Sequence, residues 1–293
     1  PYEVYSVGGP TPVNVAVIGV TSLETPYITI AAATAGLCFK DPAEAILHHY
    51  AAMDAAADVI IVLSHIGNTD GGYGYGFPVY GDQTLASKLN TAGKPVNLII
   101  GGHSHTNLAA AQTVGNTKVV QAYYNGRRVG RADFSFDGSA WNVNWASLTI
   151  GTGDTQYAPV QTLVNGFIGD PAYQALINEP VGYAQTDLLR NYEGDAMMGD
   201  FVDDAIYGAL NGDAEAGNDV DLFLNNPGGI RTDWCDKSDG VGGWIWSSTA
   251  ADCAPGVWAH DPMLLTYGMM FTILPFGNAT AVGEMSGAAI YEL

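Results

Sequence analysis

The stretch Val96-Asn97-Leu98-Ile99-Ile100-Gly101-Gly102-His103-Ser104-His105 is an apolar run that ends in two glycines and two histidines. A second apolar run, residues 59–64, ends in the same way at His65, with Gly67 close behind. Short apolar runs of this kind predict buried strands, and ligands gather at the carboxyl ends of parallel strands. Imidazoles are common metal ligands, so the two runs predict a metal site built from His65, His103 and His105.

Helices are predicted between these strands. Residues 13–20 predict a strand, and Asp41-Pro42 predicts the start of a helix that runs through Ala57, with Asp41 as N-cap. A strand over 59–63, a helix over 84–89 and a strand over 96–100 follow. This β-α-β-α-β order predicts an α/β fold in which at least part of the sheet is parallel.

The pattern changes further along the chain. Residues 118–150 alternate as β-strands do, around the hairpin signal Phe136-Asp137-Gly138-Ser139, and predict a second layer or a continuation of the first sheet. A helix over 160–178, interrupted near Gly169-Asp170-Pro171, precedes a helix over 197–210, a buried strand over 220–224 and a strand-helix pair over 282–293. We therefore expect one domain over 1–155, a linker or helix over 156–180, and a second domain over 181–293.

Composition sets limits on the partners. The 293 residues are 47% apolar and 14% charged, which is enough for one large or two ordinary domains with their own cores. No apolar run is long enough to span a membrane. The formal net charge of −20 excludes nucleic acid and anionic membranes as general partners, and it fits a soluble extracellular protein.

The three cysteines do not form a zinc-binding pattern. Cys38 stands alone, whereas Cys235 and Cys253 flank a stretch rich in Gly, Trp and Ser. A disulfide that closes this loop would stabilise the fold by about 3 kcal/mol. Two free thiols are the alternative.

A second motif, Asn226-Pro227-Gly228-Gly229-Ile230-Arg231, follows the predicted strand over 220–224. Its glycines permit close approach of the backbone to a ligand, and Arg231 offers a planar fork to a phosphate, a carboxylate or a stacked base. A plain turn with a surface arginine is the alternative. The chain has only five arginines, so one within a motif is informative.

Taken in order, four segments of the chain resemble the 5′-nucleotidase / UDP-sugar hydrolase family: Leu-Ser-His65-Ile-Gly, Gly-Gly-His103-Ser-His105-Thr, Asn226-Pro-Gly-Gly-Ile-Arg231 and Leu274-Pro-Phe276-Gly-Asn. That family consists of two-domain, calcineurin-like phosphoesterases with two metal ions. The resemblance extends over essentially the whole chain. It implies part of a four-layer metallophosphoesterase β-sandwich flanked by helices, and part of a mixed α/β substrate-binding domain.

The resemblance also implies roles for particular residues. His65 and His103 would hold one divalent ion and His105 the other, with zinc, manganese or a similar metal as the cofactor. Asn226, Gly228 and Arg231 would line a nucleotide pocket. Two further substrate-binding residues are implied: Phe276 would stack on the base, and Arg190 resembles an arginine that the family places before a helix.

The chain departs from the family pattern at both ends and within the stretch from Thr232 to Met263, which is longer than usual. The family's other metal-binding motifs and its catalytic histidine would precede residue 1, and a second stacking aromatic would follow residue 293. We therefore expect an internal portion of a nucleotide-hydrolysing enzyme that lacks activity by itself.

Two alternatives remain open at this point. The first is a cyclic-nucleotide phosphodiesterase or UDP-sugar hydrolase of the same family. The second is an extracellular structural or assembly protein with an inactive site. The expected location is extracellular, at the cell surface or periplasmic. The missing motifs leave room for a partner chain, and a homo-oligomer remains open.

Overall fold

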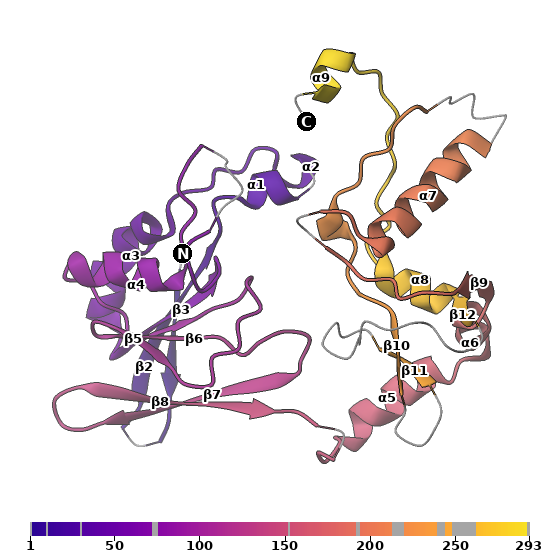
Figure 1. Cartoon of the computed structure of the whole chain (residues 1–293). Helices are drawn as coiled ribbons and strands as arrows, with labels where there is room; N and C mark the ends of the chain where they lie inside the picture. Colours follow the sequence, from indigo (N-terminus) through magenta and orange to yellow (C-terminus); the bar gives the residue numbers. More distant parts are fainter. Residues whose placement is uncertain are drawn as a thin grey trace. The chain divides into compact units, whose positions relative to one another are not determined.

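The parallel strands around the histidines form the centre of a six-stranded sheet (Figure 1). The computed structural model describes residues 2–9, 11–29, 31–71, 76–151, 153–191, 194–212, 220–238, 244–247 and 262–291. The chain divides into two compact units, Pro1–Thr155 and Gln156–Leu293. The sheet lies in the first unit, and each unit is described by itself.

The sheet has the strand order β1-β2-β3-β4-β6-β5. β2, β3, β4 and β6 are parallel, and the outer strands β1 and β5 are antiparallel to their neighbours. The parallel order predicted from the β-α-β-α-β pattern is confirmed. The strands are β1 (Tyr2–Val7), β2 (Val13–Thr21), β3 (Val59–His65), β4 (Leu98–Ile100), β5 (Gln112–Val114) and β6 (Thr117–Val120).

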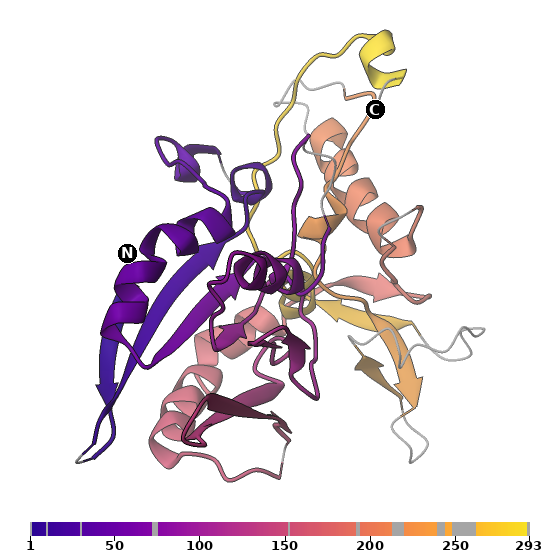
Figure 2. The ribbon, with the colours of Figure 1, turned by 90° about the vertical axis from the view of Figure 1, so that its left-hand side faces the viewer.

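Two helices cover one face of this sheet, α3 (Pro42–Ala56) and α4 (Asp82–Thr91). α3 packs against β2 and α4 against β6. Figure 2 shows α3 alongside the indigo strands at the N-terminal end of the chain. Asp41 caps α3 as predicted, because its Oδ1 accepts from the backbone N–H groups of Ala43 and Glu44 at 2.8 and 3.2 Å. The core of the unit is apolar and fully buried at Ile46, Met53, Leu85, Leu89, Val62 and Ile99.

The alternating region after β6 forms a separate hairpin, β7 (Arg128–Phe136) and β8 (Trp141–Thr149). The turn signal is confirmed: Asp137 accepts from the backbone N–H groups of Ser139 and Ala140 at 2.9 Å. The hairpin is tied to the loop after β4, because Trp145 Nε1 donates to the carbonyl of Leu108 at 2.8 Å. Of the two arrangements expected for this region, β6 therefore continues the first sheet, and β7 and β8 form a second.

The second unit begins with a helix that is broken where the sequence predicts. α5 (Ala158–Ile168) ends before Asp170, which caps α6 (Pro171–Ile177). β9 (Pro180–Ala184) pairs with β12 (Met263–Thr266), and a small core gathers around Met198 of α7 (Met197–Gly212) and Ile273 of α8 (Tyr267–Ile273). The remaining elements of both units are α1 (Thr25–Ile28), α2 (Ala31–Thr34), η1 (Pro227–Gly229), β10 (Cys235–Ser238), β11 (Trp244–Ser247) and α9 (Gly287–Tyr291).

Two predicted strands are wrong. Residues 220–224 form no strand, and Leu222 and Leu224 are 46% and 60% exposed. The side chain of Asn211 bonds to both the N–H and the carbonyl of Val220, at 2.8 and 3.1 Å, so a side chain takes the hydrogen bonds that a neighbouring strand would otherwise make. Residues 282–286 also form no strand, and the described end of the chain holds only the short helix α9.

Candidate functional site

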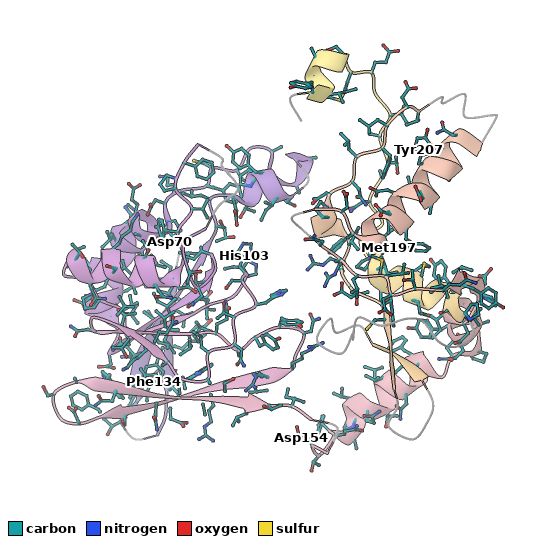
Figure 3. All side chains as sticks on the ribbon, in the orientation of Figure 1. Asp70, His103, Phe134, Asp154, Met197 and Tyr207 are labelled. Carbon is teal, nitrogen blue, oxygen red and sulfur yellow. The ribbon has the colours of Figure 1, made fainter. Side chains whose placement is uncertain are left out.

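His65 and His103 lie next to each other at the carboxyl ends of neighbouring parallel strands. His65 is the last residue of β3, paired in register with Thr21 of β2, and His103 follows β4. Their ring centroids are 5.1 Å apart, with the planes inclined at 63°. Figure 3 labels His103 where its side chain leaves the loop after the sheet. The strand-end argument therefore places these two imidazoles correctly.

The turn that carries His103 has an unusual backbone. His103 and His105 have φ angles of +71° and +53°, and Tyr123 and Asn125, in the loop after β6, have +67° and +52°. These four are the non-glycine residues with positive φ in the described part of the chain. Such angles cost energy and concentrate at functional sites, so these two adjacent loops form the candidate site on backbone grounds alone.

The two glycines of the turn are required by close approaches. A Cβ on Gly102 would lie 3.0 Å from Nδ1 of His65, and a Cβ on Gly101 would collide with the carboxylate of Asp82. A side chain at either position would push the turn away from the sheet edge. The glycines therefore let the His103 segment approach His65 closely.

Gln121, one residue beyond β6 and 1% exposed, holds the turn in place. Its Nε2 donates to the carbonyl of Gly102, and its Oε1 accepts from the backbone N–H of Thr106 and, at 3.1 Å, from the hydroxyl of Ser104. The sequence reasoning assigned this residue no role. A polar side chain directly after the buried pair Val119-Val120 is the signal that could have found it.

Glu24 is the second residue that the sequence reasoning missed. It lies just beyond β2 and is 3% exposed. Its Oε1 is 2.8 Å from Nε2 of His103. The signal in the sequence is faint, because a single acid in the segment after the strand over 13–20 has no pattern around it, and 79 residues separate the two partners.

The two acids near the histidines have different surroundings. Asp70 accepts from the backbone N–H of Gly81 at 3.0 Å and from the hydroxyl of Thr84 at 2.9 Å, so it organises its own loop. Asp82, the first residue of α4, is fully buried, and its carboxylate oxygens have no hydrogen-bond partner among the residues that the structure describes. Burial raises the pKa of Asp82 to about 6, and the nearby Ser64 hydroxyl opposes that rise.

His105 contacts an aromatic side chain, Tyr124. Its ring stacks on Tyr124 with centroids 4.8 Å apart and planes at 21°, and the guanidinium of Arg127 lies 4.8 Å from the centroid of Tyr124. His105 is exposed, like His65. Its predicted role as ligand of a second ion stays a prediction.

The donor set fits part of a metal centre. Partial burial, and then the neighbouring His103 and His105, lower the pKa of His65, which keeps its imidazole neutral and able to bind a metal at neutral pH. Two adjacent imidazoles suit a borderline metal such as zinc. Over the residues that the structure describes, however, no three His, Cys, Asp or Glu side chains come together as a complete metal site.

In the second unit the structure brings together four of the predicted substrate residues. The side chain of Asn226 accepts from the N–H of Gly228 at 2.9 Å, and Arg231 donates to the carbonyl of Gly228 at 3.0 Å. The guanidinium of Arg231 also lies 5.4 Å from the ring centroid of Phe276, which is 59% exposed. The result is a cation beside an open aromatic face.

Arg190 stabilises the segment that carries Arg231. Its guanidinium donates to both carboxylate oxygens of Asp233, at 3.3 and 3.0 Å, and to the carbonyl of Ile230 at 3.1 Å. The side chains of Arg190 and Asp233 are 23% and 6% exposed. Arg190 thus holds the segment next to Arg231, and its predicted contact with substrate stays a prediction.

The cysteine prediction can be followed only in part. Cys38 is exposed and free, and Cys235 is fully buried. Cys253 lies outside the described residues, so the predicted Cys235–Cys253 disulfide stays a prediction. Among the described helices, none has the length and apolar character needed to cross a bilayer.

Comparison with known proteins gives relatives over the full length of the chain. The cell wall protein Lmo0130 of Listeria monocytogenes is 28% identical over 315 residues, which cover 100% of this chain and 36% of that protein. The trifunctional nucleotide phosphoesterase protein YfkN of Bacillus subtilis is 27% identical over 305 residues, 100% of this chain and 17% of that protein. The chain therefore spans well under half of either relative. No protein-family model matches it.

A solved structure supports the fold. The putative 5′-nucleotidase from Staphylococcus aureus, solved with α-ketoglutarate, has a TM-score of 0.54 at 18% identity over 94% of this chain and 47% of that one. Further relatives are 5′-nucleotidases of Vibrio species. The chain shares the fold of the metallophosphoesterase class to which these proteins belong. Within that class it is homologous to the 5′-nucleotidase / UDP-sugar hydrolase family, of whose members it spans a part, and the resemblance of the motifs is confirmed.

Proposed function

We propose that this chain is part of an enzyme that hydrolyses phosphate esters of nucleotides with two divalent metal ions. The observation that carries the proposal is the pair His65 and His103, whose ring centroids are 5.1 Å apart at the ends of neighbouring parallel strands. The names of the relatives support the same chemistry, since they include nucleotide phosphoesterases and 5′-nucleotidases.

His65 and His103 would hold one divalent ion, and His105 would contribute to the other. When bound, such ions activate water and withdraw charge from the phosphoryl oxygens. The chain's own part is to keep the imidazoles oriented and close to the strand ends. Gln121 fixes the backbone on both sides of Ser104, which keeps the two histidines of the turn in place.

The second unit would bind the nucleotide. Phe276 offers an exposed ring for stacking on the base, and Arg231 offers a planar cation for ribose phosphate or for the stacked base itself. Gly228 holds the turn that carries Arg231, because its N–H donates to the side chain of Asn226 and its carbonyl accepts from Arg231. These groups recognise a nucleotide without selecting which phosphate bond is cleaved. A cyclic-nucleotide or UDP-sugar substrate is therefore the nearest alternative.

The full protein would work outside the cytoplasm. The net charge of −20 and the cell-wall relative support this location. An inactive structural role at the same location is the other alternative. The presence of His65, His103 and His105 favours the enzyme, because an inactive site would be expected to lose its metal ligands.

The experiment on substrate binding is calorimetry of the 293-residue chain with AMP. Phe276→Ala is expected to weaken binding about tenfold, because base stacking contributes on the order of 1–3 kcal/mol. The matched control is Phe271→Ala in α8 of the same unit, since Phe271 is 57% exposed and Phe276 59%. Equal affinities in the wild type and Phe276→Ala would contradict the pocket.

A second measurement concerns turnover. We expect the 293-residue chain to hydrolyse no AMP with zinc or manganese, because two neighbouring imidazoles are too few donors for a two-metal centre. The comparison variant is His65→Asn. Metal-dependent hydrolysis by the wild-type chain above the level of this variant would contradict the expectation.

A further inference from the structure

Glu24 is a buried carboxylate whose side chain is directed to one of the site histidines. It is 3% exposed, and its side chain is hydrogen-bonded to Nε2 of His103 at 2.8 Å. Burying a charged carboxylate costs free energy unless the carboxylate gains a hydrogen-bond partner. The bond to His103 offsets this cost for Glu24.

We propose that Glu24 is a positioning residue that fixes the tautomer and the ring orientation of His103 for metal binding. This rests on the function proposed above. A carboxylate oxygen only accepts, so Nε2 of His103 must carry the hydrogen and donate it. In a neutral imidazole the lone pair then resides on Nδ1, which becomes the nitrogen available to a metal ion.

The backbone of Glu24 is fixed on both sides, as a positioning role requires. Its N–H donates to the hydroxyl of the buried Ser22 at 3.2 Å. Its carbonyl accepts from the N–H groups of Tyr27 and Ile28 at 2.8 and 3.2 Å, at the start of α1. The carboxylate is therefore a fixed reference for the ring of His103.

The contact between Glu24 and His103 joins segments that follow different strands of the sheet. Glu24 lies beyond β2, His65 ends β3 and His103 follows β4, so the carboxylate and the imidazoles come from three successive strands of the sheet order. The other two site histidines differ. In the described part of the chain, His65 contacts the ring of His103 and His105 stacks on Tyr124, and neither bonds to a carboxylate. The orienting contact is thus specific to His103.

The first measurement is the tautomer of His103 in the metal-free chain, read from the nitrogen-15 shifts of its imidazole by NMR. We expect the Nε2–H tautomer in the wild type and a mixture in Glu24→Gln, because an amide can either donate or accept. Glu24→Asp retains the charge and should restore the preference in part. A wild-type His103 protonated on Nδ1 would overturn the proposal without any variant having to fold.

The second measurement is zinc affinity, by competition with a coloured chelator. Removing such a partner of a metal-binding histidine is expected to weaken zinc binding about 10- to 100-fold in Glu24→Gln. Glu284→Gln, an exposed glutamate of the second unit, is the control and should bind zinc as the wild type does. Unchanged affinity and an unchanged tautomer in a folded Glu24→Gln variant would overturn the proposal. A wild-type chain with the Nε2–H tautomer that binds no zinc would contradict the proposed function and support the orienting role.

Discussion

The histidine turn after β4 and the Arg231–Phe276 pair each have an exposed side chain, His105 and Phe276, but the residues that support them differ. Three buried polar side chains lie against the histidine turn: Glu24 and Gln121 follow strand ends, and Asp82 is the first residue of α4. The Arg231–Phe276 cluster is supported by one largely buried ion pair, Arg190–Asp233, and its aromatic ring, Phe276, is largely exposed. A metal centre needs ligands held rigidly, whereas a stacking surface needs an open aromatic face, and the two supports match those needs.

The largest expected effect comes from removing the support of the Arg231–Phe276 cluster. Asp233→Ala removes the carboxylate that pairs with Arg190, and breaking a largely buried ion pair costs about 3–5 kcal/mol. We expect the second unit to unfold at markedly lower temperature, and the backbone amide of Arg231, which donates to Ile273 at 2.8 Å, to exchange with solvent much faster. Calorimetry and hydrogen exchange measure these two effects.

The control is the exposed pair Arg131–Asp133, whose side chains are 63% and 56% exposed. Exposed pairs contribute about 0–1 kcal/mol, so Asp133→Ala should change little. Equal losses of thermal stability in Asp233→Ala and Asp133→Ala would contradict a stabilising role of the Arg190–Asp233 ion pair.

An intermediate effect is expected at the histidine turn. Gln121→Ala removes the bonds to the backbone of Gly102 and Thr106, and leaving such buried groups unpaired costs about 2–3 kcal/mol in total. We expect the NMR signals of His103 and His105 to shift and broaden, whereas Gln161→Ala on the exposed helix α5 leaves them unchanged. Sharp, unshifted histidine signals in Gln121→Ala would contradict the role of Gln121 as a clamp.

The last effect concerns Asp82, and it depends on pH, so that it vanishes in acid. Because burial raises its pKa to about 6, the folded chain keeps a proton that the unfolded chain has already lost, and stability falls as pH rises from about 4 to about 6. Asp82→Asn removes this penalty and should stabilise the first unit by up to about 3 kcal/mol at pH 8 and by nothing near pH 4. Urea unfolding at the two pH values measures the gain, with the exposed Asp54→Asn as control. A gain of equal size at both pH values would contradict the buried charge as its cause.

Much of the first unit could be predicted from local sequence. The runs that became β2 and β3, and the Asp41-Pro42 start of α3, have clear periods and caps, and the register of parallel strands then brings His65 near His103. The strand over 220–224 failed because a short apolar run does not reveal whether a neighbouring strand exists, and the side chain of Asn211 occupies its backbone instead. Glu24 and Gln121 escaped prediction because their roles depend on partners that only the folded sheet brings near.

The most direct test of the histidine pair as a metal site is a zinc titration of the chain, followed by NMR of its histidine side chains. A second pair provides an internal control: His48 and His49 of α3 have ring centroids 4.7 Å apart, but they are sequence neighbours within a helix and do not follow strands. We predict that zinc first shifts the signals of His65 and His103, that His48 and His49 respond only at higher concentration, and that His65→Asn abolishes the first response. A first response at His48 and His49, or an unchanged response in His65→Asn, would contradict the account.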